Sequence, residues 1–154
     1  MGNTVVVRPV RVRDPEVLQL IDALTVELAA SGYRDDESFG YSPEQLEHGG
    51  VYLVGARIAD RLAGIGGVEL QDDHVAELKR FYVHPEDRGS GVADALMAFL
   101  VALAQEHAVR VLRLETGDRQ HAALKFYRRH GFVKVPRFPP YVESARSICL
   151  QRDL

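Results

Sequence analysis

The sequence has few of the features that stabilise a chain covalently or direct it to a membrane. Its 154 residues include a single cysteine, Cys149, so no internal disulfide can form. Cys149 lies in a segment where apolar and polar residues alternate, and we interpret it as a buried strand residue rather than a nucleophile. The longest nearly apolar stretch, 92–104, contains Asp94 and is shorter than the roughly 20 residues that a membrane-spanning helix needs.

The chain also lacks an excess of basic residues. Its 19 lysines and arginines against 22 aspartates and glutamates give a formal net charge of −3, which predicts no attraction to a nucleic acid or to an anionic membrane. Near the start, three consecutive valines are soon followed by arginines at positions 8, 11 and 13, unlike the apolar region of a signal peptide. We therefore expect a cytoplasmic protein that binds neither nucleic acid nor a membrane.

Three common ligand-binding motifs are absent from the sequence. No GxxxxGKS/T segment occurs, which excludes a phosphate-binding loop of the nucleoside triphosphatase type, and no GxGxxG spacing indicates a dinucleotide site. The six histidines show no HxxxH or HExxH spacing, and no cysteine pair accompanies them. We expect no bound metal.

What is present is the composition of an ordinary globular chain, with 46% hydrophobic and 27% charged residues. A chain of this length buries roughly 70% of its unfolded surface, so we expect one domain over 1–154 without a covalent or metal staple. In the first predicted helix, Val17, Ile21, Leu24 and Leu28 share one face, which we expect in the core. The predicted helices cover 15–30, part of 33–50, 92–107 and 120–130, and the predicted strands cover 4–9, 51–58, 62–70, 75–83, 109–115, 132–135 and 146–150.

The most informative segment is RGSGVA at 88–93, which follows a predicted strand and leads directly into a predicted helix. Glycines allow a tight turn, and the amide groups at a helix N-terminus converge on an anion with the helix dipole behind them. The segment predicts a phosphate or pyrophosphate site, although a plain glycine-rich connection explains it equally well.

The RGSGVA segment, preceded by a strand that ends in Val83-His84-Pro85, resembles motif A of the GNAT superfamily of acyl-CoA N-acyltransferases, R-x-x-G-x-A. A second block, LETG at 114–117 followed by QHAALKFYRRHGF at 120–132, is similar to the family's motif B. The two blocks occur in the family's order, with one helix and one strand between them, and the resemblance covers essentially the whole chain. It implies an α/β fold of the α+β type, a mixed and mostly antiparallel sheet of about seven strands flanked by about four helices.

The resemblance also implies acetyl-CoA as cosubstrate, held in a wedge between the fourth and fifth strands. The backbone of Phe81, Tyr82 and Val83 would pair with pantetheine. Arg88 would either screen phosphate charge or brace the loop, and Gln120, which replaces the family's usual asparagine, would reach pantetheine with its amide. The amides that would hold the pyrophosphate belong to Gly89, Ser90, Gly91, Val92, Ala93 and Asp94.

Acetyl transfer from a thioester to an amine needs a base, stabilisation of the oxyanion and a proton for the departing thiolate. Glu77 and Glu115 both match positions of a catalytic glutamate in some family members, and each could instead be a structural carboxylate paired with Arg80, Arg113 or Arg119. Tyr127 matches the family's tyrosine near the CoA sulfur and is the predicted acid, although it also fits an ordinary amphipathic helix position. A backbone amide near Tyr82 or Val83 would meet the oxyanion.

We expect the acceptor to be a primary amine of a small molecule, bound by the variable segments 33–50 and 136–146 through Tyr33 and Tyr141. The alternatives are a protein or peptide N-acetyltransferase, an enzyme for longer acyl chains, and an acyl-CoA sensor without turnover. A homodimer is also considered, in which the apolar segment 147–150 either forms part of the interface or completes the sheet.

Overall fold

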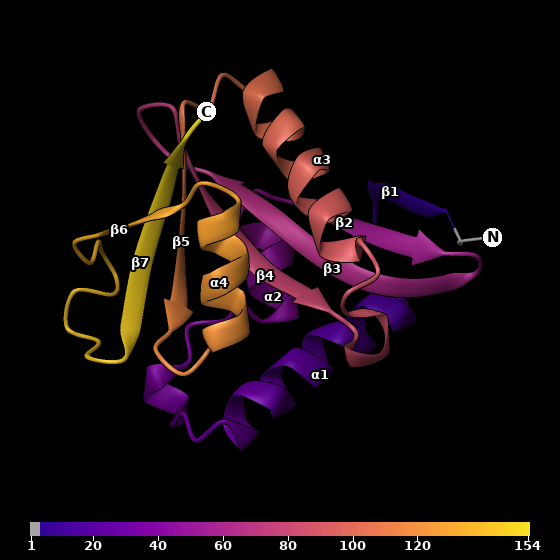
Figure 1. Ribbon diagram of the computed structural model, residues 1–154, viewed down its shortest axis with the longest axis horizontal. Coiled ribbons are helices and arrows are strands. Elements are labelled where there is room, and N and C mark those ends of the chain that lie inside the picture. The colour runs from indigo at the N-terminus through magenta and orange to yellow at the C-terminus, as the bar shows by residue number, and fades with distance from the viewer. Residues whose placement is uncertain (1–3) are drawn as a thin grey trace.

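The computed structural model describes residues 4–154, which form one seven-stranded sheet with the strand order β1-β2-β3-β4-β5-β7-β6 (Figure 1). All neighbouring strands are antiparallel except β4 and β5, which are parallel. The mixed, mostly antiparallel sheet with four helices is therefore confirmed. The strands are β1 (Val5–Pro9), β2 (Val51–Ile58), β3 (Arg61–Leu70), β4 (Val75–Val83), β5 (Val111–Gly117), β6 (Val133–Val135) and β7 (Ser147–Asp153). The helices are α1 (Pro15–Ala30), α2 (Pro43–His48), α3 (Val92–Glu106) and α4 (His121–Arg129), with single 3-10 turns at Asp35–Glu37 and Pro85–Asp87.

The helices cover both faces of the sheet, as the alternation of buried side chains along the strands requires (Figure 1). On one face Val54 and Ala56 of β2 pack in the same cluster as residues of α3 and α4. On the other face Leu53, between them in sequence, belongs to a cluster with residues of α1 and α2. The nearly apolar stretch 92–104 is thus a packed helix, α3.

Local signals in the sequence set the ends of the helices. Pro15 occupies the first turn of α1, where its missing N–H is not needed. Gly131, directly after α4 and its capping residue, has φ = +87°, the left-handed conformation expected at a helix C-terminus. The prediction for α1 holds for Val17 and Ile21, which are buried, and for Leu24, which is partly buried against the same cluster. It was wrong for Leu28, which with Leu24 lines a cavity described below.

The glycines of β3 predicted a bulge or a close backbone approach, and the pairing of β3 with β4 contains a bulge whose extra residue lies on β4. The register of β3 with β4 shifts between Ile65 and Gly67, so that Arg80 and Phe81 of β4 together lie opposite Gly66. Arg80 at this bulge has φ = +50°, an unusual conformation for a residue with a Cβ atom.

The C-terminal strand β7 lies inside the sheet, hydrogen-bonded to β5 on one side and to β6 on the other. It therefore completes the sheet, as one of the two interpretations of segment 147–150 proposed. Cys149 in this strand is fully buried, in agreement with its interpretation as a core residue. Over residues 4–154, no helix is long and apolar enough to cross a membrane.

Candidate functional site

The two central strands diverge and open the sheet. β4 and β5 pair only from Val75 to Glu77 and from Val111 to Arg113. Beyond Glu77 and Arg113, β4 continues along β3 while β5 continues along β7, so the two strands are no longer paired with each other. Two neighbouring cavities lie in this opening, and both are bordered by Leu24, Phe81, Gln120, Ala123 and Tyr127.

The larger cavity, about 510 Å³, lies over the glycine-containing turn and is here called the outer cavity. Gly89 and Gly91 have φ values of +81° and +88°, which residues with side chains adopt only with strain. The turn leads directly into α3, whose first N–H groups have no partner within the helix and face the turn. The outer cavity is lined by the predicted cofactor residues Phe81, Tyr82, Val83, Arg88, Gly89, Gly91, Ala93, Asp94, Gln120 and Tyr127.

Arg88 is fixed by the protein on two sides. Its Nε donates to the carbonyl oxygen of Val83 at 3.1 Å, and its Nη2 lies 3.0 Å from Oε2 of Glu27 in α1. These contacts fit the interpretation of Arg88 as a brace for the turn, while its place in the lining leaves a phosphate contact open.

Asp94, in the first turn of α3, is held by the end of α4. Its Oδ1 lies 2.7 Å from Nε2 of His130 and 3.2 Å from Nη2 of Arg129. The hydrogen bond from His130 lowers the pKa of the Asp94 carboxyl, with smaller contributions from Arg129. The carboxylate charge at this edge of the outer cavity is thus offset by two basic side chains.

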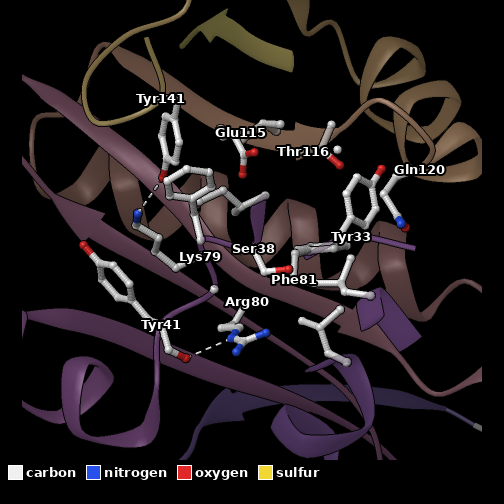
Figure 2. A pocket seen from close by; sticks show the side chains of 18 of the residues that line it. Tyr33, Ser38, Tyr41, Lys79, Arg80, Phe81, Glu115, Thr116, Gln120 and Tyr141 are labelled. Atoms are coloured by element: carbon white, nitrogen blue, oxygen red, sulfur yellow. Dashed lines mark hydrogen bonds between the residues drawn. The ribbon is translucent and has the colours of Figure 1, made fainter. Parts of the chain in front are cut away.

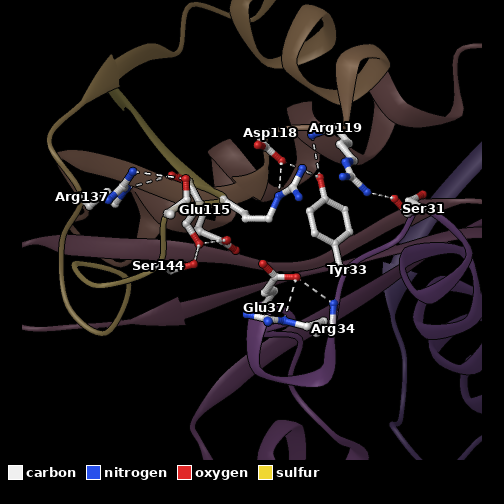
Figure 3. Close-up of polar contacts among 12 residues, drawn as sticks. Ser31, Tyr33, Arg34, Glu37, Glu115, Asp118, Arg119, Arg137 and Ser144 are labelled. Carbon is white, nitrogen blue, oxygen red and sulfur yellow. Dashed lines mark hydrogen bonds and ion pairs between the residues drawn. The ribbon is translucent and has the colours of Figure 1, made fainter.

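The smaller cavity, about 140 Å³, extends from Tyr127 toward the loops before α2 and before β7, and is here called the inner cavity (Figure 2). Both predicted acceptor residues line it. Tyr33 is buried, and its hydroxyl accepts a hydrogen bond from the N–H of Arg119 at 2.6 Å (Figure 3). Tyr141 is buried as well and packs edge-on against Phe39. The aromatic residues of segment 33–50 therefore line a site as well as pinning a loop.

Tyr127 lies where the outer and inner cavities meet. Its ring packs against Phe81, Phe126 and Phe132. Its hydroxyl forms no hydrogen bond with a described residue. Since every fully buried polar side-chain atom between residues 4 and 154 has a hydrogen-bond partner, the Tyr127 oxygen is not fully buried and borders open space. Burial raises the pKa of Tyr127, and the nearby Glu115 raises it further, so the hydroxyl keeps its proton at neutral pH.

Glu115 lines the inner cavity near the end of β5. The hydroxyl of Ser147 donates to its Oε2 at 2.6 Å, and no basic side chain within 4–154 forms an ion pair with it (Figure 3). Burial raises the pKa of this carboxyl, only partly offset by the hydrogen bond from Ser147. A carboxyl with a raised pKa in a cavity is a recurring feature of functional sites.

Glu77 is bound much more firmly than Glu115. Its Oε2 lies 2.7 Å from Nζ of Lys79 and accepts a hydrogen bond from the Tyr141 hydroxyl at 2.6 Å, while its Oε1 accepts one from Gln71 at 3.0 Å. Arg80, Arg113 and Arg119, the expected partners if the glutamates are structural, form no ion pair with either of them within residues 4–154, and Glu77 pairs with Lys79 instead. Lys79 lies two positions along the same strand and so points to the same face as Glu77. The two-residue spacing of Glu77 and Lys79 is the feature of the sequence that could have indicated this ion pair.

The sequence of the chain is similar to those of known acetyltransferases. The sequence model of the acetyltransferase (GNAT) family matches residues 18–132. The chain is 26% identical over 155 residues to the IAA acetyltransferase of Azospirillum brasilense, covering 100% of both proteins. It is 34% identical over 84 residues to the uncharacterized N-acetyltransferase YedL of Escherichia coli, and this match spans 53% of each chain, about half the length of the relative.

Solved structures show the same architecture. A Klebsiella pneumoniae protein assigned to the acyl-CoA N-acyltransferases superposes with a TM-score of 0.83 at 28% identity, over 98% of both chains. The PaiA N-acetyltransferase of Thermoplasma acidophilum, solved in complex with coenzyme A, superposes with a TM-score of 0.79 at 16% identity, over 98% of this chain and 99% of that one.

Proposed function

Because the chain belongs to the GNAT family of N-acetyltransferases, we propose that it transfers an acetyl group from acetyl-CoA to the primary amine of a small molecule. The observation that carries this proposal is the junction of the two cavities. The outer cavity has the glycine turn and helix N-terminus that suit a pyrophosphate, the inner cavity has room for a small acceptor, and Tyr127 borders both. Direct attack in a ternary complex needs this kind of continuous passage.

The residues that line the outer cavity fit acetyl-CoA. The backbone of Phe81, Tyr82 and Val83 lies beyond the point where β4 pairs with β5, so its groups that face away from β3 can pair with pantetheine amides, apart from the Val83 carbonyl, which accepts from Arg88. The turn and first residues of α3, 89–94, would hold the pyrophosphate, with Arg88 bracing the turn and Gln120 closing the cavity between the strands. The bound acetyl-CoA would supply the activated acetyl thioester. The Thermoplasma acidophilum protein of the same fold was solved in complex with coenzyme A, which supports an acyl-CoA as the cosubstrate.

Glu115 is the proposed general base. An amine with an ordinary pKa is mostly protonated at neutral pH, and Glu115 would accept its proton directly or through water. Its raised pKa and the absence of an ion-pair partner among the described residues favour it over Glu77, whose two oxygens accept three hydrogen bonds. Glu77 would position Lys79 and Tyr141 around the acceptor.

Tyr127 is the proposed general acid. Its hydroxyl is protonated, has no other described partner and borders open space, so it is free to donate a proton to the departing thiolate. A backbone N–H near Tyr82 or Val83, just after the bulge at Arg80, would stabilise the negative charge that develops on the carbonyl oxygen.

The test starts with calorimetric titration of acetyl-CoA and CoA into the purified protein. Ala93 lines the outer cavity in the first turn of α3, so Ala93→Asp adds a negative charge there, and Ala93→Asn is its uncharged match. An acidic residue in the first turn favours the helix, and because Ala93 packs partly against the core, circular dichroism of both variants shows whether they are folded. We expect micromolar binding by the wild type and by Ala93→Asn, and weaker binding by Ala93→Asp.

An amine library, assayed by release of the CoA thiol, then tests turnover. Binding without acetylation of any small amine would favour a sensor or a protein acceptor over the proposed function. Absence of acetyl-CoA binding by the folded wild type would overturn it.

A further inference from the structure

The inner cavity contains an arginine whose charge has no acidic partner. Arg80 lies on β4 at the bulge opposite Gly66, with φ = +50°. No carboxylate among residues 4–154 forms an ion pair with it, and burial alone lowers its pKa. A partly buried charge without a counterion is unfavourable, and residues in unusual backbone conformations cluster at ligand sites.

The protein holds one part of the Arg80 guanidinium and leaves the rest free. Its Nε donates to the carbonyl oxygen of Tyr41 at 2.9 Å (Figure 2). Its Nη2 donates to the hydroxyl of Thr25 at 3.1 Å. Gly40 packs directly on the guanidinium, since a Cβ atom there would lie 2.4 Å from Cζ. A guanidinium has five N–H groups, so those on Nη1 and one on Nη2 have no described partner.

The two N–H groups on Nη1 border open space. Every buried polar side-chain atom in the described part of the chain has a hydrogen-bond partner, so the unbonded Nη1 of Arg80 is accessible to solvent. The open space that Arg80 lines is the inner cavity. The unbonded Nη1 can donate charge-assisted hydrogen bonds to a carboxylate.

The other cation of the cavity, Lys79, is already satisfied. Its three donors face Glu77 at 2.7 Å, the Tyr141 hydroxyl at 3.2 Å and the ring of Tyr41, whose centroid lies 4.1 Å away. Binding an acceptor anion at Lys79 would break one of these contacts. Among residues 4–154 that line the inner cavity, Arg80 is thus the cation with unbonded donors and Glu115 the carboxylate without an ion-pair partner. The two lie on opposite sides of the view in Figure 2.

We propose that Arg80 binds a carboxylate of the acceptor, so that the acceptor is a small amino-carboxylate whose amine points to Glu115. This inference rests on the proposed function and adds the chemical class of the acceptor. An amine and a carboxylate in one small molecule match the charges of Glu115 and Arg80, which both line the inner cavity. Arg80 is then the residue that determines specificity.

The experiment compares acceptors that differ only in the carboxylate. Glycine, β-alanine, 4-aminobutyrate, leucine and phenylalanine are each assayed beside their primary amides, with the wild type and with Arg80→Gln. We expect kcat/KM of the wild type to favour at least one carboxylate over its amide. For that acceptor, Arg80→Gln should raise KM roughly 10- to 100-fold for the carboxylate and by less than about 3-fold for the amide. Differences in amine reactivity between a carboxylate and its amide cancel when Arg80→Gln is compared with the wild type, because both proteins are assayed with the same two acceptors.

Thr25→Val is the matched control for a purely structural role of Arg80. It removes the hydrogen bond from Nη2 but keeps the guanidinium, so we expect it to retain the preference for the carboxylate. Arg80→Lys keeps a charge without the two N–H groups of Nη1 and should restore the preference only in part. Circular dichroism and acetyl-CoA titration show whether each variant is folded.

The outcomes separate the two proposals. Acetylation of amides and carboxylates with equal efficiency by the wild type would overturn the role of Arg80 and leave the acetyltransferase proposal intact. Equal losses for both members of a pair in Arg80→Gln would overturn it as well, by showing a structural role alone. Failure of the folded wild type to bind acetyl-CoA would overturn the proposed function, and the inference with it.

Discussion

Replacing Lys79 by methionine tests the buried charge pair at the wall of the inner cavity. The side chains of Lys79 and Glu77 are 8% and 2% exposed, and Nζ lies 2.7 Å from Oε2. Methionine has nearly the same length and can pack against the ring of Tyr41, so the main effect of Lys79→Met is to leave the Glu77 carboxylate buried without a counterion.

The size of the effect follows from the contacts that remain. Removing one partner of a buried ion pair lowers the free energy of unfolding by about 3–5 kcal/mol. Tyr141 and Gln71 still donate to Glu77, so we expect a loss near the lower end, about 3 kcal/mol. For a chain of this size about 1 kcal/mol corresponds to about 2–4 °C, so the melting temperature should fall by about 6–12 °C.

Thermal and urea unfolding of the single and double variants provide the measurement. Glu77→Gln added to Lys79→Met removes the uncompensated charge, so the double variant should recover to within about 1 kcal/mol of the wild type. Arg13→Met, which breaks the exposed pair of Arg13 with Glu47, should leave the melting temperature close to that of the wild type. A double variant no more stable than Lys79→Met would refute the view that a desolvated charge is responsible.

Four further substitutions test the site and the core. Tyr127→Phe should lower kcat by about 100-fold or more while leaving acetyl-CoA affinity within about 3-fold, because only the hydroxyl is lost; calorimetry and the thiol-release assay separate the two effects. In the wild type the rate should rise with pH as Glu115 loses its proton, and Glu115→Gln should abolish this rise. It should also raise the melting temperature at neutral pH, because burial raises the pKa of Glu115 in the folded state and the charged carboxylate therefore destabilises the fold there. That gain should vanish as pH falls below about 4, where the carboxyl is protonated in the folded and unfolded states alike. Ala93→Asp, compared with Ala93→Asn, should weaken acetyl-CoA binding by about 10-fold or more through repulsion of the pyrophosphate, an effect that added salt reduces. Leu100→Ala, at a fully buried position of α3, should lower the free energy of unfolding by about 2–5 kcal/mol, as measured in urea.

The fold was largely predictable because its signals are local. The spacing of Val92, Leu96 and Leu100 defines one face of α3, and Gly131 marks the end of α4, since both depend on the conformation of neighbouring residues. The glycines of β3 and the RGSGVA turn likewise indicated the bulge and the helix N-terminus before any contact was known. These features need no information about distant segments.

The site itself was only partly predictable. The positions of Tyr127, Tyr33, Tyr141 and the two glutamates followed from the motifs and loops, and all five border the inner cavity. Which partner each one meets did not follow, because those partners are distant in sequence. Tyr141 donates to Glu77 across 64 positions, and Arg80 reaches Thr25 across 55.

Periodicity and motifs in the sequence alone determined the elements of this protein, their order and the family to which it belongs. Tertiary structure alone decided that Glu77 is bound by Lys79, that Leu24 and Leu28 border a cavity, and that Arg80 keeps free donors there. The physical reason is that backbone conformation responds to the nearest few residues, whereas burial and pairing of charges depend on how β4, β5 and the loops around them meet in space.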